Sequence, residues 1–255
     1  MSVPTRDGRS SAATEPKPES DETGFTIENR LGGTHAPNYR QWEIDTVAPH
    51  CGSSVLEVGS GMGWFSEKLH ELGLQRLVLS DLEDYTLGKL REKYAGDDHV
   101  DVIKVALPGH IDVGERVETV VAMNVLEHIE DDVAALRSLS DALVPGGRIV
   151  LWVPAYQALY GEFDRKVGHF RRYTPKTMRA VVDAAGLNIQ EIRPINLLGG
   201  IAWWLAVRRK GVGAPNPKLV WLYDRLVVPA GRAVERLARP PFGQSVVCVA
   251  RKPVH

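Results

Sequence analysis

Cysteine, excess charge and long apolar runs are all scarce in this sequence. Its two cysteines, Cys51 and Cys248, lie far apart and outside any Cys-x-x-Cys or Cys/His array. The sequence therefore gives no support for a disulfide framework or a zinc site, and we interpret both residues as buried apolar side chains. The formal net charge of −1 gives no overall reason to expect nucleic acid as a partner. No run approaches the ~18 apolar residues of a membrane span, and the N-terminus lacks the apolar core of a signal peptide, so we expect a cytoplasmic protein.

Composition divides the chain into a tail, a core domain and a helical insertion. Residues 1–23 mix Ser, Thr, Pro and charges of both signs with almost nothing to bury, which predicts a disordered tail. The remainder is long enough for one substantial core, which we place at residues 24–194 together with 244–255. Residues 195–243 form the insertion. The spacing of Trp42, Ile44 and Val47 predicts a helix that packs on the core.

Short β-branched runs alternate with amphipathic stretches from residue 53 onward. The runs predicted to be strands are Ser54–Val58, Arg76–Ser80, Val100–Val105, Thr119–Met123, Arg148–Val153, Asn188–Arg193 and Ser245–Arg251. Such alternation is typical of βαβ units and of a parallel sheet covered on both faces. We predict a Rossmann-like α/β fold with a seven-stranded, mostly parallel sheet, helices on both faces and a helical insertion before the last strand. The helix over residues 133–143 is predicted to end at Pro145-Gly146-Gly147.

A glycine-rich turn follows the first predicted strand. In the segment VLEVGSGMGWF, Gly59, Gly61 and Gly63 are spaced G-x-G-x-G, and Trp64 occupies the place of the third glycine in a dinucleotide fingerprint. Bare backbone at such a turn lets a ligand approach closely. Asp81 ends the second strand at about the distance expected of an acidic residue that binds a ribose. Together these features predict an adenosine-containing ligand.

Three motifs in this order resemble the class I S-adenosylmethionine-dependent methyltransferases. They are E-x-G-x-G-x-G after the first strand, Asp81 after the second and Asn124–Ile129 (NVLEHI) after the fourth. The resemblance implies S-adenosylmethionine as cofactor, with the three glycines along its methionine end and Asp81 on its ribose. Glu57 would support the turn, although it is equally interpretable as a structural partner of backbone amides. The remaining cofactor residues that the resemblance suggests are Leu82, Ala106 and Asn124.

The segment 154–174 is a long connection after the fifth strand, and connections of this length are commonly functional. Its pattern, ending in GHxRRYT, resembles a bacterial subgroup of type 11/12 methyltransferases, as does the later PPFG segment. His169 is the candidate general base, with His128 and Tyr160 as further catalytic candidates; either histidine can instead be structural. Arg171 and Arg172 suit an anionic acceptor or pairing with nearby acids. The other candidate substrate residues are Tyr156, Asp164 and Tyr173.

No metal constellation is evident, because the histidines are scattered along the chain. The insertion is basic and rich in tryptophan, with Arg208, Arg209, Lys210, Lys218, Arg225, Arg232, Arg236 and Arg239 set against Asp224 and Glu235. This composition suits a lid over the acceptor site, a homodimer contact or a peripheral surface on anionic lipid.

We predict a methyltransferase that acts on a small-molecule or lipid-linked acceptor, at oxygen in preference to nitrogen or carbon. Two rival interpretations stay open from the sequence. One is an NAD-dependent oxidoreductase, and the other is a catalytically silent binding module whose basic helices meet a membrane or a partner.

Overall fold

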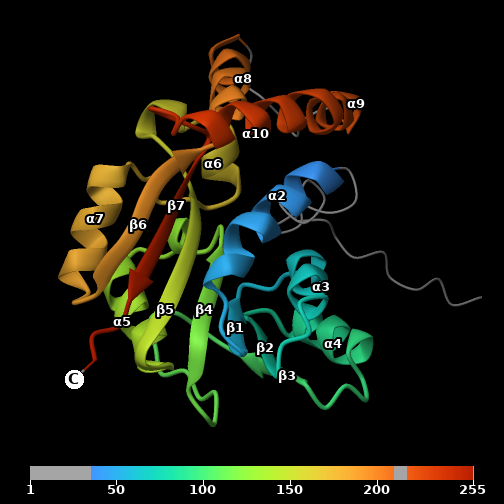
Figure 1. Ribbon diagram of the computed structural model, residues 1–255, viewed down its shortest axis with the longest axis vertical. Helices are drawn as coiled ribbons and strands as arrows, with labels where there is room; N and C mark the ends of the chain where they lie inside the picture. Colours follow the sequence, from blue (N-terminus) through green and yellow to red (C-terminus); the bar gives the residue numbers. More distant parts are fainter. Residues whose placement is uncertain (1–35, 210–216, 255) are drawn as a thin grey trace, which may run out of the picture.

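A single mixed sheet organises the chain. The computed structural model describes residues 36–209 and 217–254 (Figure 1), so the predicted tail 1–23 and Lys210 lie outside the described residues. The seven strands follow the order β3-β2-β1-β4-β5-β7-β6. Their bounds are β1 Ser54–Val58, β2 Arg76–Asp81, β3 Val100–Lys104, β4 Val117–Met123, β5 Leu143–Pro154, β6 Asn188–Ile195 and β7 Ser245–Arg251. Strands β1 to β5 pair in parallel, whereas β7 runs antiparallel to both β5 and β6. The predicted seven-stranded, mostly parallel sheet is confirmed.

Helices cover both faces of the sheet, as the sequence predicts. Helices α2 Pro37–Val47, α3 Trp64–His70 and α4 Asp84–Lys93 bury side chains against one face, and α5 Asp132–Asp141 and α7 Pro175–Ala184 against the other (Figure 1). Successive strand residues point to opposite faces. Accordingly Val55 of β1 belongs to the core under α2 and α3, while Leu56 belongs to the core under α5 and α7.

Helix α5 ends earlier than the sequence pattern predicts. It ends at Asp141, and β5 already begins at Leu143, so Pro145-Gly146-Gly147 lies within the strand rather than at a helix end. Leu143 pairs with Val117, and the register then shifts before Arg148 pairs with Thr119. A Cβ at Gly147 would lie 3.0 Å from the Glu118 carbonyl oxygen. The glycines therefore serve a β-bulge against a close neighbouring strand.

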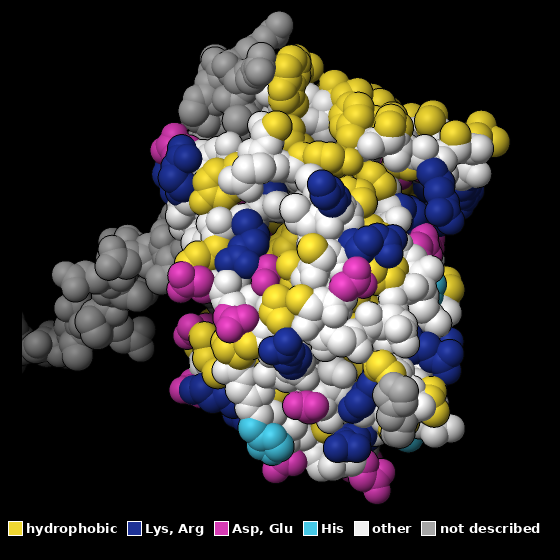
Figure 2. Space-filling view, turned by 90° about the vertical axis from the view of Figure 1, so that its left-hand side faces the viewer, with side chains coloured by type: hydrophobic (Ala, Val, Ile, Leu, Met, Phe, Trp, Pro, Cys, Tyr) yellow, Lys and Arg dark blue, Asp and Glu magenta, His cyan; other side chains and the backbone are white. Residues whose placement is uncertain are grey.

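The segment between β6 and β7 is helical and lies across one end of the sheet (Figure 1). It comprises α8 Leu197–Arg209, α9 Pro217–Leu222, the π-helical turn Tyr223–Val227 and α10 Val228–Leu237. Hydrophobic side chains gather on its outer surface at the top of the molecule (Figure 2). None of the helices in the described parts of the chain is both long and apolar enough to cross a membrane.

Two acidic residues fasten this helical segment to the rest of the molecule. Asp224 accepts hydrogen bonds from the backbone N–H groups of Asn38, at 3.1 Å, and Tyr39, at 2.8 Å, and so caps the first turn of α2. Glu235 accepts from the backbone N–H groups of Asn196 and Leu197 where α8 begins. The acids of the insertion therefore serve helix starts inside the molecule and do not offset the arginines on its outer face.

Short helical turns complete the connections beside the sheet. They are η1 Ala48–His50, η2 Leu126–His128 after β4, and η3 Gln157–Leu159 and α6 Glu162–Lys166 within the long connection after β5.

Candidate active site

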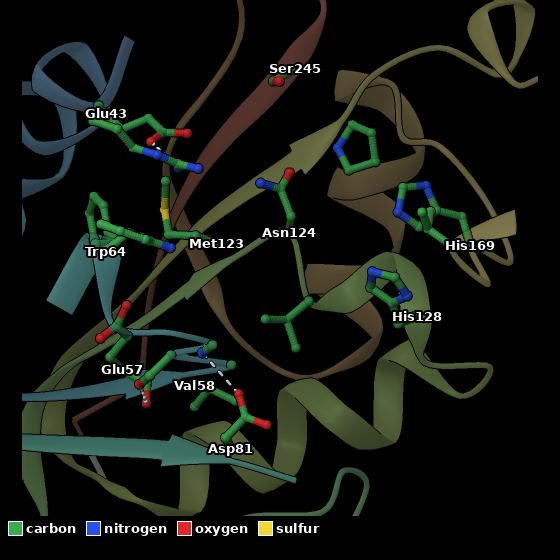
Figure 3. Close-up of a pocket in the computed structure, with 18 of the residues that line it drawn as sticks. Glu43, Glu57, Val58, Trp64, Asp81, Met123, Asn124, His128, His169 and Ser245 are labelled. Atoms are coloured by element: carbon green, nitrogen blue, oxygen red, sulfur yellow. Dashed lines mark hydrogen bonds and ion pairs between the residues drawn. The ribbon is translucent and has the colours of Figure 1, made fainter. Parts of the chain in front are cut away.

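A cavity of about 610 Å³ opens beyond the carboxyl ends of β1, β2, β4 and β5. This volume lies within the range of roughly 300–1,000 Å³ typical of small-molecule sites. In Figure 3, Glu57 and Asp81 lie on one side of the cavity, His128 and His169 on the other, and Asn124 between them. Residues that are distant in sequence therefore share one site at the edge where open α/β sheets bind ligands.

The glycine turn brings bare backbone to the cavity. Gly59 has a φ of +73°, and a Cβ there would lie 2.6 Å from Cγ2 of Val125, so the position admits only glycine without rearrangement. The Gly61 N–H donates to Oδ2 of Asp81 at 2.9 Å, and Oδ1 accepts from the Glu83 N–H at 3.0 Å. The turn and the carboxylate thus hold each other in place, with Asp81 only 5% exposed.

Gly63 lies outside the cavity lining, unlike Gly59 and Gly61. It precedes the first residue of α3 with a φ of +77°, and a Cβ there would lie 2.9 Å from Cδ2 of Leu90. The structure therefore explains this glycine by the start of a helix packed against α4. Direct contact between Gly63 and a cofactor stays a prediction without geometric support.

Glu57 is a buried carboxyl group at the base of the turn. Its Oε2 accepts a hydrogen bond from Oγ of Ser66 at 2.5 Å. Burial raises the pKa of Glu57 to about 7, against the lowering effect of the hydroxyl groups of Ser66 and Ser60. The side chain consequently exchanges a proton near neutral pH while it supports the turn.

Sequence reasoning missed a buried ion pair on α2 that also lines the cavity. Nη1 of Arg40 lies 2.5 Å from Oε2 of Glu43, which is fully buried, and burial raises the pKa of this glutamate. One available signal was the position of Glu43 between Trp42 and Ile44, which are both core residues. A charge on the buried side of a helix needs a partner or a ligand.

Backbone and apolar groups form the part of the cavity between β3 and β4. Val105, Ala106 and Leu107 line it, as does Leu82, which is 55% exposed. Asn124 adopts a positive φ of 53° and donates its N–H to the Trp152 carbonyl oxygen at 2.7 Å. Left-handed backbone of this kind is uncommon outside glycine and concentrates at functional sites.

His169 belongs to a buried polar cluster at the other side of the cavity. Its Nδ1 lies 2.8 Å from Oδ1 of Asp164, and the same carboxylate accepts from Nε of Arg172 at 2.7 Å. Burial raises the pKa of Asp164, but the hydrogen bonds from His169 and Arg172 outweigh it and hold the pKa below its usual range. Because an ionised carboxylate only accepts hydrogen bonds, Nδ1 of His169 is the nitrogen that donates to Asp164, and Nε2 is left to face the other groups of the cluster.

Five of the candidate residues in the 154–174 connection do not line the cavity. The Tyr156 hydroxyl donates to the Pro241 carbonyl oxygen, that of Tyr160 to the His169 carbonyl oxygen, and that of Tyr173 to Asp132. Arg171 also pairs with Asp132, at 2.7 Å. Arg171 and Tyr173 therefore tie the connection to α5, Tyr156 ties it to the segment before β7, and Tyr160 and Asp164 hold the connection internally. Within this set His169 and Arg172 alone reach the cavity, and His128 joins them from η2.

The helical insertion supplies an apolar wall. Trp203, Val220 and Tyr223 line the cavity together with Phe163 and Val167 from the long connection. The indole of Trp203 packs edge-on against Phe163 at a centroid distance of 5.4 Å, and its Nε1 donates to the Leu159 carbonyl oxygen at 3.0 Å. This half of the cavity suits an apolar or aromatic group.

Residues 29–192 match a family model described as a methyltransferase domain, and this match covers more than half of the chain. The chain belongs to this methyltransferase family. The methyltransferase is 26% identical over 196 residues to a ubiquinone biosynthesis O-methyltransferase of Methylobacterium nodulans, covering 66% of this chain and 77% of that protein. It is 29% identical to the corresponding protein of Ruegeria pomeroyi over 41% of this chain, and the match spans only 42% of that relative.

Among solved structures, phosphoethanolamine N-methyltransferase 2 of Haemonchus contortus, in complex with S-adenosyl-L-methionine, has a TM-score of 0.61. It is 16% identical, and the match covers 92% of this chain and 58% of that chain. The likeness shows a shared fold. With the family match, it makes this protein an S-adenosylmethionine-dependent methyltransferase and removes the basis for an oxidoreductase.

The residues of the cavity fit that cofactor. The backbone of Gly59, Ser60 and Gly61 lines the cavity, so a ligand can lie close to it. The carboxylate of Asp81 is held where it can accept hydrogen bonds from two ribose hydroxyls. Arg40 places a half-buried cation beside Glu57, which suits the carboxylate of the cofactor's amino-acid end.

Proposed function

We propose that this methyltransferase methylates an apolar small molecule or a lipid-linked acceptor, at oxygen in preference to nitrogen or carbon. One observation carries the proposal: a continuous cavity joins the glycine turn and Asp81 to the histidine pair and the aromatic wall of the insertion. We infer that the cofactor would occupy the end at the glycine turn and the acceptor the end at the aromatic wall. The aromatic wall favours an apolar acceptor over a strongly charged one.

The roles of the residues follow from their places around the cavity. Asp81 and the Gly59–Gly61 backbone would bind and orient the cofactor, which supplies an electrophilic methyl group. Trp203 and Phe163 would align the acceptor so that its oxygen lies in line with that group and water is excluded. His169 would accept the hydroxyl proton at Nε2, while Asp164 holds the ring and stabilises the resulting imidazolium. Arg172 forms an ion pair with Asp164. This pairing argues against a role for Arg172 in binding an anionic acceptor.

The test of this function is a cofactor titration followed by an acceptor panel. Calorimetry should show binding of S-adenosylhomocysteine and no response to NADH. Methyl transfer should be faster to phenols and other hydroxylated apolar compounds than to matched amines. His169→Ala should slow turnover and preserve S-adenosylhomocysteine affinity, whereas the exposed His99→Ala should change neither. Faster transfer to the amines, or to charged acceptors, would contradict the proposal.

We also propose that the protein is cytoplasmic and peripheral at membranes, with the outer face of the insertion on anionic lipid. The face presents Trp221, Leu222 and Leu226 at 54%, 45% and 60% exposure. Arg225 and Arg236 are exposed on the same helical segment, and the guanidinium of Arg225 lies over the ring of Trp221. The side chains of Arg208 and Arg209 lie outside the described residues. Because the same helices form the apolar wall of the cavity, a lipid-linked acceptor would have a short path from membrane to site.

Vesicle sedimentation tests this surface. Binding to vesicles of phosphatidylcholine with phosphatidylglycerol should exceed binding to phosphatidylcholine alone and weaken with salt. Arg225→Glu with Arg236→Glu should reduce it at least ~5-fold per residue, at ~1 kcal/mol each, while Lys89→Glu with Arg91→Glu, two exposed residues of α4, makes the same change of net charge and serves as the control. No preference for anionic vesicles, together with a dimer in light scattering that Leu222→Glu dissociates, would favour a homodimer contact instead.

A further inference from the structure

Three metal-ligating side chains from two separate segments meet at the cavity wall. Glu127 and His128 lie in η2 after β4, and His169 lies after α6. One ligand atom from each lies within 4.8 Å of the other two. We propose that Glu127, His128 and His169 bind a divalent first-row transition cation. The sequence alone predicts no such site, because His169 is far from the other two residues along the chain.

The orientation of His169 matches that of a metal-ligating histidine. Nδ1 lies 2.8 Å from Oδ1 of Asp164 and donates to it, and Nε2 faces Oε1 of Glu127, 4.0 Å away. Metal-bound histidines nearly always donate their second ring nitrogen to a carboxylate or carbonyl in this way. Asp164 is itself held by Arg172 and by the Gly161 N–H. Asp164 and its partners therefore already hold the His169 ring in the orientation that a metal ligand requires.

The backbone fixes the distance between the two segments. The Phe170 N–H donates to the Glu127 carbonyl oxygen at 2.8 Å, and the His169 N–H donates to the Asp164 carbonyl oxygen at 2.8 Å. Glu127 and His169 are both buried, whereas His128 is half-buried. The rings of His128 and His169 meet edge-on at a centroid distance of 4.6 Å. Backbone hydrogen bonds and burial therefore hold these three residues close together.

Two imidazole nitrogens and one carboxylate oxygen are the donor set of open zinc sites, which keep a fourth position for water or substrate. Ligand atoms around a tetrahedral ion with bonds of ~2.1 Å lie ~3.4 Å apart. The three ligand atoms must therefore move slightly closer together when the ion binds. Because His128 and His169 both line the cavity, the open position would face the acceptor. Imidazole donors favour zinc, cobalt, nickel or iron over magnesium or calcium.

This site deepens the proposed function, on which its chemical consequence rests. A hydroxyl bound at the open position loses its proton to water more readily, because the cation stabilises the oxyanion. The oxygen then forms a bond to the methyl carbon, and the carbon–sulfur bond breaks with its electron pair passing to sulfur. Nε2 of His169 would serve as a ligand in this form, in place of its role as proton acceptor.

The test is direct titration of the full chain, free of any affinity tag, after dialysis against EDTA. Calorimetry with Zn²⁺ should give one site per chain, and Co²⁺ should produce visible d–d absorption. Glu127→Gln and His128→Ala should each weaken Zn²⁺ binding at least ~10-fold, the lower end of the loss seen even for residues around metal ligands. His99→Ala, which removes an exposed histidine at the opposite edge of the sheet, should keep the site.

S-adenosylhomocysteine binding by the same variants shows that they are folded. Should a variant not fold, the Co²⁺ spectrum and Zn²⁺ stoichiometry of the unmutated chain still decide the point. Absence of binding by both ions, or equal binding by the variants and His99→Ala, would overturn the inference. The proposed function would survive that outcome if methyl transfer persists in the EDTA-treated chain, so the two failures are distinguishable.

Discussion

At the scale of single residues, the interaction with the clearest geometry is the mutual support of Asp81 and the glycine turn. The carboxylate accepts from two backbone N–H groups, at 2.9 and 3.0 Å, and this leaves lone pairs for the cofactor ribose. Position and orientation are thus set before any ligand arrives, which reduces the cost of binding.

Asp81→Asn should weaken S-adenosylhomocysteine binding by ~1–3 kcal/mol, because charge-assisted hydrogen bonds to the ribose are lost. Calorimetry on both proteins measures the difference. Asp84→Asn is the matched control, since Asp84 is exposed and pairs only with Lys104 among the contacts seen here. An unchanged dissociation constant for Asp81→Asn would refute the ribose assignment.

Glu57 should make stability depend on pH. Its pKa is about 7 in the folded chain and about 4.5 in the unfolded chain, so the unfolded state releases the proton first as pH rises. Stability should therefore fall between pH 4.5 and 7 by up to ~3 kcal/mol and level off above that range. Urea unfolding at pH 5 and pH 8 should show a smaller difference for Glu57→Gln than for the unmutated chain.

Glu67→Gln, which alters an exposed glutamate paired with Lys93, should retain the pH dependence of the unmutated chain. The hypothesis fails if Glu57→Gln and Glu67→Gln lose equal stability between the two pH values.

Local pattern predicted the residues that belong to one segment and missed those that depend on a second segment. Gly59 and Asp81 stand at fixed places after their strands, so spacing alone was sufficient to find them. Arg40 and Glu43 face the cavity only because α2 packs across β1 and β4, which no motif encodes. Tyr160, Arg171 and Tyr173 have residue types suited to chemistry, but they bond to the His169 carbonyl oxygen and to Asp132 and do not line the cavity.

At the scale of elements, α2 depends on a residue outside its own segment. Its N-terminal residue Ala36 provides no side-chain cap, and Asp224 of the π-helical turn takes that place. Tyr39, Arg40 and Glu43 of this helix line the cavity, so the cap couples the insertion to the cofactor end of the site.

Asp224→Ala should lower the free energy of unfolding by ~1–2 kcal/mol through loss of the cap. It should also weaken S-adenosylhomocysteine binding, because the first turn of α2 frays beside the cavity. Chemical denaturation and calorimetry measure the two effects. Asp45→Asn, which removes an exposed pair between α2 and Arg232, should change stability by less than ~1 kcal/mol. Equal effects of the two substitutions would argue against the capping role.

Element boundaries were predictable wherever periodicity and sheet pairing agree. Strands β1 and β7 match their predicted bounds, because both are short apolar runs with sharp polar ends. The start of β5 was not predictable, since Pro145-Gly146-Gly147 is typical of a helix end, whereas here a register shift against β4 requires it. The antiparallel direction of β7 follows from tertiary packing alone.

At the scale of the whole molecule, the cavity is shared by α2, the sheet, the long connection and the insertion. A cofactor bound there would contact both α2 and the insertion, which are joined by the hydrogen bonds of the Asp224 side chain. Binding should therefore stabilise the assembly as a unit and not only the sheet.

S-adenosylhomocysteine at 100 times its dissociation constant should raise the free energy of unfolding by ~2.7 kcal/mol. Hydrogen exchange should slow in α2 and in residues 217–237 as well as in the glycine turn. Protection confined to the turn and Asp81 would show that the insertion is independent of the cofactor site. The exposed helix α7, which does not line the cavity, provides an internal reference.

The two ends of the insertion are fastened to each other as well as to the core. Ile195 pairs with Ser245 across the antiparallel strands, and the Asn196 side chain donates to that of Gln244 at 2.8 Å. The sheet therefore closes without help from the intervening helices, and a tight β-turn would span the same gap. Exchange of this segment could therefore alter the acceptor preference and keep the sheet intact, provided that the new segment also caps the first turn of α2, as Asp224 does here.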